Sequence, residues 1–320
     1  AASDVYKRQQ REAKQIGDFK ESISLNEHLR GTKRTLQYRP DGDEFVCVNG
    51  KNRYTRALYG SHSPFRVETS DRPVFAFYNN GRGGNISFKV ILRDGTELAL
   101  DCTGHCESRY SAGKRTYYLT DPSWGKGELR ISVLALADMD GAIWRFSPSN
   151  MPKGAILRWQ HGGATGKRLS RNGDMGVDPA DCFELPAEAT DLVTGELPLQ
   201  KEVYLVRGEV PEGYNVRKLY QQAEAASMAL ASHLKIETPD PYLNTLGGAL
   251  VAAADGIWDG QVWLHGAIGW RMPLSGWRAG YTGDALGWHD RARTHFDVYA
   301  ASQVTDVPNT IPCLLYTSDA

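Results

Sequence analysis

The sequence of 320 residues lacks the features that would assign it at once to a membrane or nucleic-acid-binding class. It has 37 Lys and Arg against 38 Asp and Glu, so no excess charge attracts nucleic acid or an anionic membrane. No run of about 18 apolar residues occurs, so we expect no transmembrane helix. The remaining composition is that of an ordinary globular protein, and its length suggests roughly two domains.

Cysteine is scarce as well, with 5 residues in the chain. The segment CTGHC at 102–106 offers two thiols and His105, whereas a structural zinc site usually has four ligands and no second cluster supplies the rest. We therefore expect no metal and no other cofactor, and we interpret these cysteines as ordinary strand or loop residues. A Cys102–Cys106 disulfide is the alternative in an exported protein. GGATGK at 162–167 is not a phosphate-binding loop, because the spacing of that motif is absent.

The two ends of the chain look foreign to the rest. Residues 1–9 (AASDVYKRQ) and 313–320 (CLLYTSDA) resemble translated sequencing-adapter sequence, so neither enters the reasoning about the fold. Residues 1–35 then form a scar and a polar lead-in without clear periodicity. We expect the chain to be a truncated piece of a longer protein, from which a signal peptide could have been lost.

Residues 36–208 carry the signature of an antiparallel β-structure. Strand-like runs lie at 45–59, 85–92, 96–100, 115–119, 128–137, 142–147, 155–159 and 201–208. Several alternate apolar and polar residues, and Asn-Gly or Asp-Gly turns separate some of them. Such strands without intervening helices predict a β-sandwich. Residues 160–200 are predicted to be a long irregular insertion, either a loop that reaches a site or a solvated surface loop.

A helical region follows the sandwich. Apolar spacing predicts a connecting helix over 215–234, within a segment 209–238. Residues 239–312 are predicted to hold further helices, one from Leu243 to Ile257 and one over 286–303. About thirty residues, 255–285, would connect these two helices, although such connections usually need two to eight.

Five of the eight tryptophans lie between 258 and 288, in a stretch that is also rich in glycine, Asp and Arg. Indole rings stack on the apolar faces of sugars, and Asp, Arg and His bind their hydroxyl groups. Facing carboxylates could act as general acid and base in glycoside hydrolysis. The alternative is packing, because tryptophans often pin a loop to a helical domain and Arg–Asp pairs often hold its geometry.

The segment AAADGIWDGQVWLHGAIGWRMPLSGWRAGYTGDALGWHDRARTHF (252–296), after a sandwich, resembles the six-hairpin or (α/α)6-barrel glycosidases. The likeness is to proteins of polysaccharide-degrading bacteria that are distantly similar to α-L-rhamnosidases. It implies that a β-sandwich is followed by the start of an incomplete (α/α)6 barrel. It also implies an inverting mechanism with two separated carboxylates and a water molecule.

One comparison with the rhamnosidases can be made residue by residue. They carry a segment Glu-Arg-x-Gly-Trp-x-Gly-Asp-Ala whose Glu and Asp lie in the active site, and residues 277–285 resemble it. Arg278 and Asp284 match, as do the two glycines and the final alanine. Tyr281 replaces the Trp, and Trp277 replaces the Glu. The resemblance therefore implies a role for Asp284 and leaves the family's acid to another residue, in the part of the chain that we expect to be missing.

The sequence thus predicts a piece of a glycoside hydrolase that acts on a polysaccharide or oligosaccharide and is periplasmic or secreted. The alternatives are a polysaccharide lyase, with His265 or a Tyr as base and Arg271 neutralising a uronate, and a carbohydrate-binding protein without catalysis. The candidate catalytic carboxylates are Asp284, Asp259 and Asp255. The candidate substrate-binding residues are Trp258, Trp263, His265, Trp270, Arg271, Trp277, Arg278 and Trp288.

Overall fold

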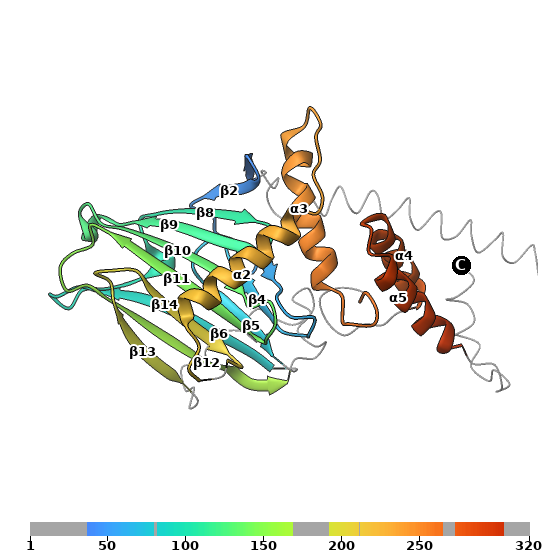
Figure 1. Cartoon of the computed structure of the whole chain (residues 1–320). Helices are drawn as coiled ribbons and strands as arrows, with labels where there is room; N and C mark the ends of the chain where they lie inside the picture. Colours follow the sequence, from blue (N-terminus) through green and yellow to red (C-terminus); the bar gives the residue numbers. More distant parts are fainter. Residues whose placement is uncertain (1–36, 80–81, 169–191, 211, 265–272, 304–320) are drawn as a thin grey trace, which may run out of the picture. The chain divides into compact units, whose positions relative to one another are not determined.

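Two antiparallel β-sheets packed face to face form the main body of the protein (Figure 1). The structure is a computed structural model that describes residues 37–79, 82–168, 192–210, 212–264 and 273–303. The strand order is β1-β2-β8-β9-β10-β11-β14 in the first sheet. In the second it is β13-β12-β6-β5-β4-β3, with β7 paired to β6. The predicted β-sandwich is confirmed.

The strands of the first sheet are β1 (Arg39–Asp41), β2 (Glu44–Val48), β8 (His105–Ser111), β9 (Lys114–Thr120), β10 (Glu128–Ala135), β11 (Gly141–Ser149) and β14 (Val203–Gly208). Those of the second are β3 (Arg56–Leu58), β4 (Arg66–Thr69), β5 (Phe75–Asn79), β6 (Arg82–Ile91), β7 (Glu97–Ala99), β12 (Ile156–Arg168) and β13 (Val193–Pro198). Two short 3-10 helices lie at Leu100–Cys102 and Pro122–Trp124.

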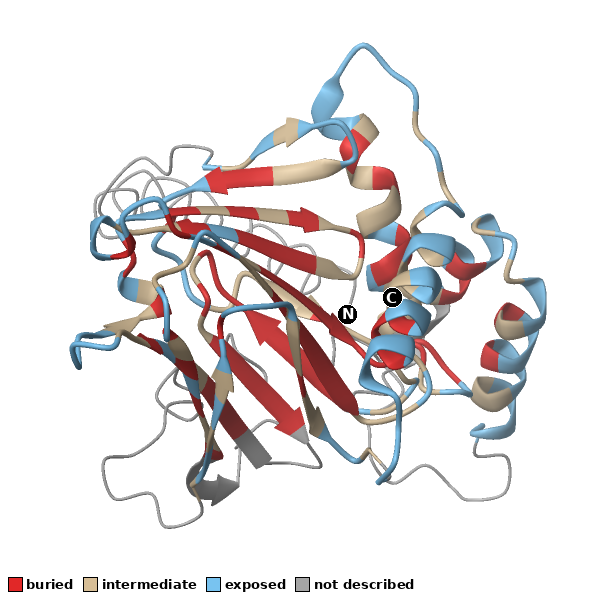
Figure 2. Ribbon diagram, turned by 60° about the vertical axis from the view of Figure 1, so that its left-hand side comes forward, coloured by how far each residue is buried: buried red, intermediate tan, exposed pale blue. Residues whose placement is uncertain are grey.

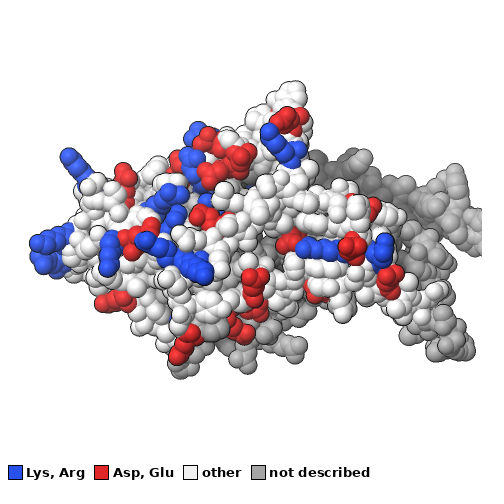
Figure 3. Space-filling view, viewed as in Figure 1, with Lys and Arg blue, Asp and Glu red and all other residues white. Residues whose placement is uncertain are grey.

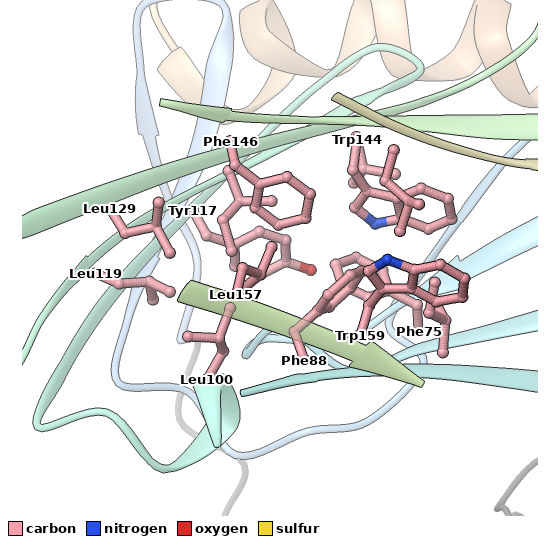
Figure 4. Close-up of a cluster of buried hydrophobic side chains, with 14 of the residues drawn as sticks. Phe75, Phe88, Leu100, Tyr117, Leu119, Leu129, Trp144, Phe146, Leu157 and Trp159 are labelled. Carbon is pink, nitrogen blue, oxygen red and sulfur yellow. The ribbon is translucent and has the colours of Figure 1, made fainter. Parts of the chain in front are cut away.

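The core between the sheets is aromatic. Figure 2 shows buried residues along the strands, and Figure 4 shows the side chains that fill the space between the sheets. Trp144 of β11 is fully buried, and the rings of Phe75 and Phe77 meet it edge-on at 5.6 and 5.7 Å. Phe75 and Phe77 lie two residues apart on β5, so both side chains point to the same face of the second sheet. The core therefore follows from the period-two pattern of the sequence.

The predicted irregular insertion at 160–200 is wrong at both of its ends. β12 continues through Gly162 and Gly163, which pair with Asn85 and Gly84 of β6, and reaches Arg168. β13 then returns over Val193–Pro198 and pairs with β12. Small residues with little side-chain pattern hid the extension, which pairs with the backbone of β6. The rest of the insertion lies outside the described residues.

In the described part of the chain, four helices follow or cover the sandwich: α2 (Val216–Ala231), α3 (Pro241–Gly256), α4 (Pro273–Ala285) and α5 (His289–Ala301). α2, predicted as a connector, lies across β10, β11 and β14 on the outer face of the first sheet (Figure 1). Its Leu219 and Tyr220 pack against Leu134 and Ile143 of that sheet. Within the described residues, every helix is too short or too polar to cross a bilayer.

The predicted thirty-residue connection between two helices is also wrong, because α4 occupies its second half. Glycine disfavours a helix by about 1 kcal/mol relative to alanine, which made this Gly-rich segment look irregular. In the structure the glycines are needed where α4 meets its neighbours. A Cβ atom on Gly283 would lie 2.0 Å from the Trp263 ring, and one on Gly280 would lie 2.7 Å from Phe296.

Candidate functional site

Asp284 lies in the last turn of α4, just before the connection to α5. The chain reverses there through Gly287, whose φ of 80° suits glycine, and the Trp288 N–H donates to the Gly283 carbonyl. This turn brings the Asp284 carboxylate against His289, the first residue of α5, with a hydrogen bond of 2.6 Å between Oδ1 and Nδ1. The side chain of Asp284 remains 58% exposed and that of His289 72% exposed. The pair is therefore open to a ligand from solvent.

Two further polar side chains of α4 precede Asp284. Arg278 and Tyr281 lie six and three residues before it, so each member of this oblique stripe is the surface neighbour of the next, and the stripe turns by about 120° around the helix. Both are exposed, Tyr281 at 59%. The stripe offers a guanidinium, an aromatic ring and a carboxylate, which are the groups that bind and orient a sugar.

Trp258 and Trp263 are buried and do not form an exposed platform. Trp263 is 1% exposed, its ring centre lies 4.6 Å from that of Trp258, and its indole N–H donates to the Ala254 carbonyl at 3.0 Å. Its backbone N–H donates to Nδ1 of the buried His295 at 3.0 Å. Trp263 therefore joins the end of α3 to α4 and α5, and a sugar cannot reach it. Trp258 is 6% exposed. The burial of Trp258 and Trp263 fits a packing role better than the predicted role in substrate binding.

Trp288 is half-buried and engaged by its neighbours. The His233 ring stacks on it at 5.3 Å, and the Arg291 guanidinium lies 4.8 Å from its ring centre. Trp288 therefore also has contacts that make it a packing residue.

Asp255 lies in a cleft of about 250 Å³ between the sandwich and the helices. Its Oδ1 accepts a hydrogen bond from Arg291 at 2.7 Å and lies 3.2 Å from Nε2 of His62, which comes from a loop of the sandwich. Burial alone would raise the pKa of Asp255, but the bonds from His62 and Arg291 outweigh it and lower that pKa from 3.8. An ionised carboxylate held by a guanidinium is a weak proton acceptor, so Asp255 is a poor candidate for a general base. Its contacts with His62 and Arg291 instead connect the sandwich to α3 and α5.

The wall of the same cleft contains Tyr59. Its ring touches Gly256, the last residue of α3, and burial raises the pKa of its hydroxyl. Tyr59 therefore stays protonated and fills space between sandwich and helix.

Asp259 has a local structural role. Its Oδ1 accepts hydrogen bonds from the backbone N–H groups of Gln261 and Val262, at 2.9 and 2.8 Å. The turn they close brings Trp258 and Trp263 together as a β-bridge. These bonds explain Asp259 as a turn residue.

His265, Trp270 and Arg271 lie outside the described residues. Trp277 belongs to α4 by its backbone, and its side chain is likewise outside the description. No group of three or more His, Cys, Asp or Glu side chains that could hold a metal occurs among the described residues.

Sequence reasoning missed three histidines that the structure places beside predicted residues. His289 follows Asp284 by five residues, and this short spacing across a Gly-Trp turn was a signal that could have been used. His62 is 193 residues from Asp255, so only the docking of the sandwich loop on α3 brings them together. His295 is buried under Trp263 and carries no sequence signal of that contact.

We expect Gly283→Ala to lower the free energy of unfolding by about 1–3 kcal/mol, because the added methyl group displaces the Trp263 ring. The measurement is urea unfolding followed by circular dichroism. Thr282→Ala, at the exposed neighbouring position of α4, is the control and should leave stability nearly unchanged. If Gly283→Ala instead stabilises the protein, as helix propensity alone predicts, the close contact with Trp263 is refuted.

We expect Asp255→Asn to lower the free energy of unfolding by about 1–2 kcal/mol at pH 7, because Arg291 and His62 lose an ionised partner. The folded-state pKa of Asp255 is lowered, so its stabilising contribution is present above pH 3.8 and is lost as the pH falls further. Urea unfolding at several pH values measures this. The difference in the free energy of unfolding between Asp255→Asn and wild type should become smaller below pH 3.8. The exposed Asp297→Asn should have the same free energy of unfolding as wild type at every pH.

Comparison with known proteins gives one family match. Residues 80–208 match a family described as a domain of unknown function, DUF4450. The matched segment runs from β6 to the end of β14, less than half of the chain, and leaves out the first five strands and all four helices. No curated protein matches the chain.

Proposed function

We propose that the protein is a glycoside hydrolase that acts on a polysaccharide or oligosaccharide and that Asp284 is one of its catalytic carboxylates. The observation that supports this is the exposure of the Asp284–His289 pair at the end of the stripe formed by Arg278 and Tyr281. Asp255 and Asp259, by contrast, are engaged in an ion pair and a turn.

In an inverting mechanism one carboxylate removes a proton from a water molecule while an acid protonates the leaving oxygen from the other side of the sugar. The His289 bond holds Oδ1 of Asp284 and leaves Oδ2 to accept the proton of the attacking water. Arg278 donates hydrogen bonds to sugar hydroxyls, and the Tyr281 ring packs against the apolar face of the sugar. We assign the general acid to a residue outside the described ones.

The same proposal makes α3, α4 and α5 the first helices of an (α/α)6 barrel. Leu243 and Leu250, seven residues apart on α3, are each 47% exposed, and an apolar stripe of this kind suits a further helix. A hydrolase of polymers too large to enter a cell acts in the periplasm or after secretion, and we propose that location.

The test uses this chain and the product of its complete reading frame. Each is incubated with rhamnogalacturonan, polygalacturonate and xyloglucan, and reducing ends, ultraviolet absorbance and bound glycan are measured. New reducing ends without an ultraviolet-absorbing product, with inverted anomeric configuration by NMR, support the proposal. An absorbing product indicates a lyase, binding without turnover indicates a carbohydrate-binding protein, and neither binding nor turnover contradicts all three.

A further inference from the structure

A second hollow, of about 520 Å³, lies on the outer face of the first sheet, beyond the part that α2 covers. This volume is in the range of small-molecule sites. It is formed where β8 and β10 begin and β9 and β11 end. Figure 3 shows acidic and basic side chains intermingled over the strands beside α2.

Strand register places the lining in two rows across the sheet. Paired neighbours in the first row are Glu107, Tyr118, Arg130 and Ser147. Those in the second row are His105, Thr120, Glu128 and Ser149. The residues between the rows, such as Leu119 and Leu129, are buried in the core, so both rows face outward. Each row crosses four hydrogen-bonded strands, β8 to β11. The pairing of these strands holds the polar groups of a row at a fixed spacing.

The charged groups in this hollow are incompletely paired. Nε of Arg130 is buried and has no hydrogen-bond partner among the described residues. Neither Arg130 nor Glu128 forms an ion pair with a described residue, whereas Glu107 is bound by Arg109 at 2.6 Å. Arg130 lies 5.3 Å from the ring centre of Tyr118, which is 38% exposed. The hollow thus presents an aromatic ring together with a guanidinium at Arg130 and a carboxylate at Glu128, which both lack an ion-pair partner among the described residues.

We propose that this hollow is a binding site for a neutral saccharide, separate from the Asp284 site and independent of catalysis there. A sugar hydroxyl both donates and accepts, so one chain of hydroxyl groups satisfies Arg130, Glu128 and the Ser and Thr hydroxyls together. A purely anionic ligand would be repelled by Glu128, and a purely cationic one by Arg130. A peptide strand would need a free sheet edge, whereas this is a sheet face.

The experiment titrates the isotope-labelled full chain with cellohexaose, xylohexaose or hexagalacturonate and follows backbone amide shifts by NMR. We expect the neutral hexasaccharides to shift amides of β8–β11 around Arg130. Arg130→Ala and Glu128→Ala should each weaken this binding about tenfold or more, since each removes a charge-assisted hydrogen bond. Lys126→Ala, an exposed basic residue in the adjoining turn, is the charge-matched control and should bind within a factor of about 2 of wild type.

Three results would overturn the proposal: no shifts with either neutral hexasaccharide, shifts with hexagalacturonate alone, or equal losses in Lys126→Ala and Arg130→Ala. Thermal melting of each variant shows that the fold is intact. Glycan hydrolysis without amide shifts in these strands would refute this site and leave the proposed function standing. Amide shifts without hydrolysis would support this site and contradict the proposed function.

Discussion

Asp284→Asn is expected to lower kcat/KM for glycan hydrolysis by about 10²–10⁴-fold in the product of the complete reading frame, the range contributed by one general base. The amide keeps the size and the exposure of the side chain but cannot accept the proton of the attacking water. Most of the loss should appear in kcat, because the Arg278 and Tyr281 contacts to the sugar are retained. Steady-state kinetics with reducing-end detection measures it.

Asp290→Asn is the matched control for this prediction. Asp290 is an exposed aspartate in the first turn of α5, one residue after His289, and has no side-chain ion pair with a described residue. Its kcat/KM should stay within a factor of about 3 of wild type, since only a favourable charge near a helix terminus is lost. Equal activity of Asp284→Asn and wild type would remove Asp284 from the mechanism.

Arg115→Ala is expected to lower the free energy of unfolding by about 3–5 kcal/mol, because it leaves a buried carboxylate without its cation. Arg115 of β9 and Asp71 are both 0% exposed and lie 3.6 Å apart. Arg115 also donates to the Tyr38 hydroxyl at 2.9 Å and to the Ser108 hydroxyl at 3.0 Å. The hydroxyl of Tyr38 donates in turn to Asp71, so one deletion disturbs several bonds.

The double variant Arg115→Met, Asp71→Leu distinguishes a charge effect from lost packing. Removal of both charges should cost much less than Arg115→Ala, because no uncompensated buried charge remains. Arg158→Ala, which breaks exposed ion pairs with Glu97 and Glu196, is the surface control and should change stability little. If the double variant is as unstable as Arg115→Ala, the buried charge is not the cause. Urea unfolding measures all three.

The strands that the sequence predicted best have a clear period of two, such as β10, in which Leu129, Ile131 and Val133 face the core. β4 escaped prediction because all four of its residues, Arg66–Thr69, are buried. Arg66 and Glu68 form a buried ion pair there. A prediction from hydrophobic pattern assigns such charged residues to the surface. Local pattern therefore fails where a charged pair takes the place of apolar residues.

The candidate site was predictable only in part for a related reason. Asp284 lies within a short motif, and its neighbour His289 is close in sequence. The burial of Trp263 depends on a glycine of α4 and a histidine of α5, and the pairing of Asp255 depends on a distant loop. Such tertiary contacts decide whether an aromatic or acidic residue binds a ligand or holds the fold, and residue type alone does not distinguish the two.

The packing of α2 bears on how the protein can be divided. On β10 the outward positions change from Arg130 in the open hollow to Leu134 under the helix, and Leu134 is 1% exposed only because α2 covers it. The sandwich boundary drawn from the sequence at residue 208 would uncover this apolar surface and make the truncated sandwich prone to aggregate. Because α2 completes the packing of the first sheet, we expect a fragment that extends through Ala231 to be more soluble than one that ends at residue 208.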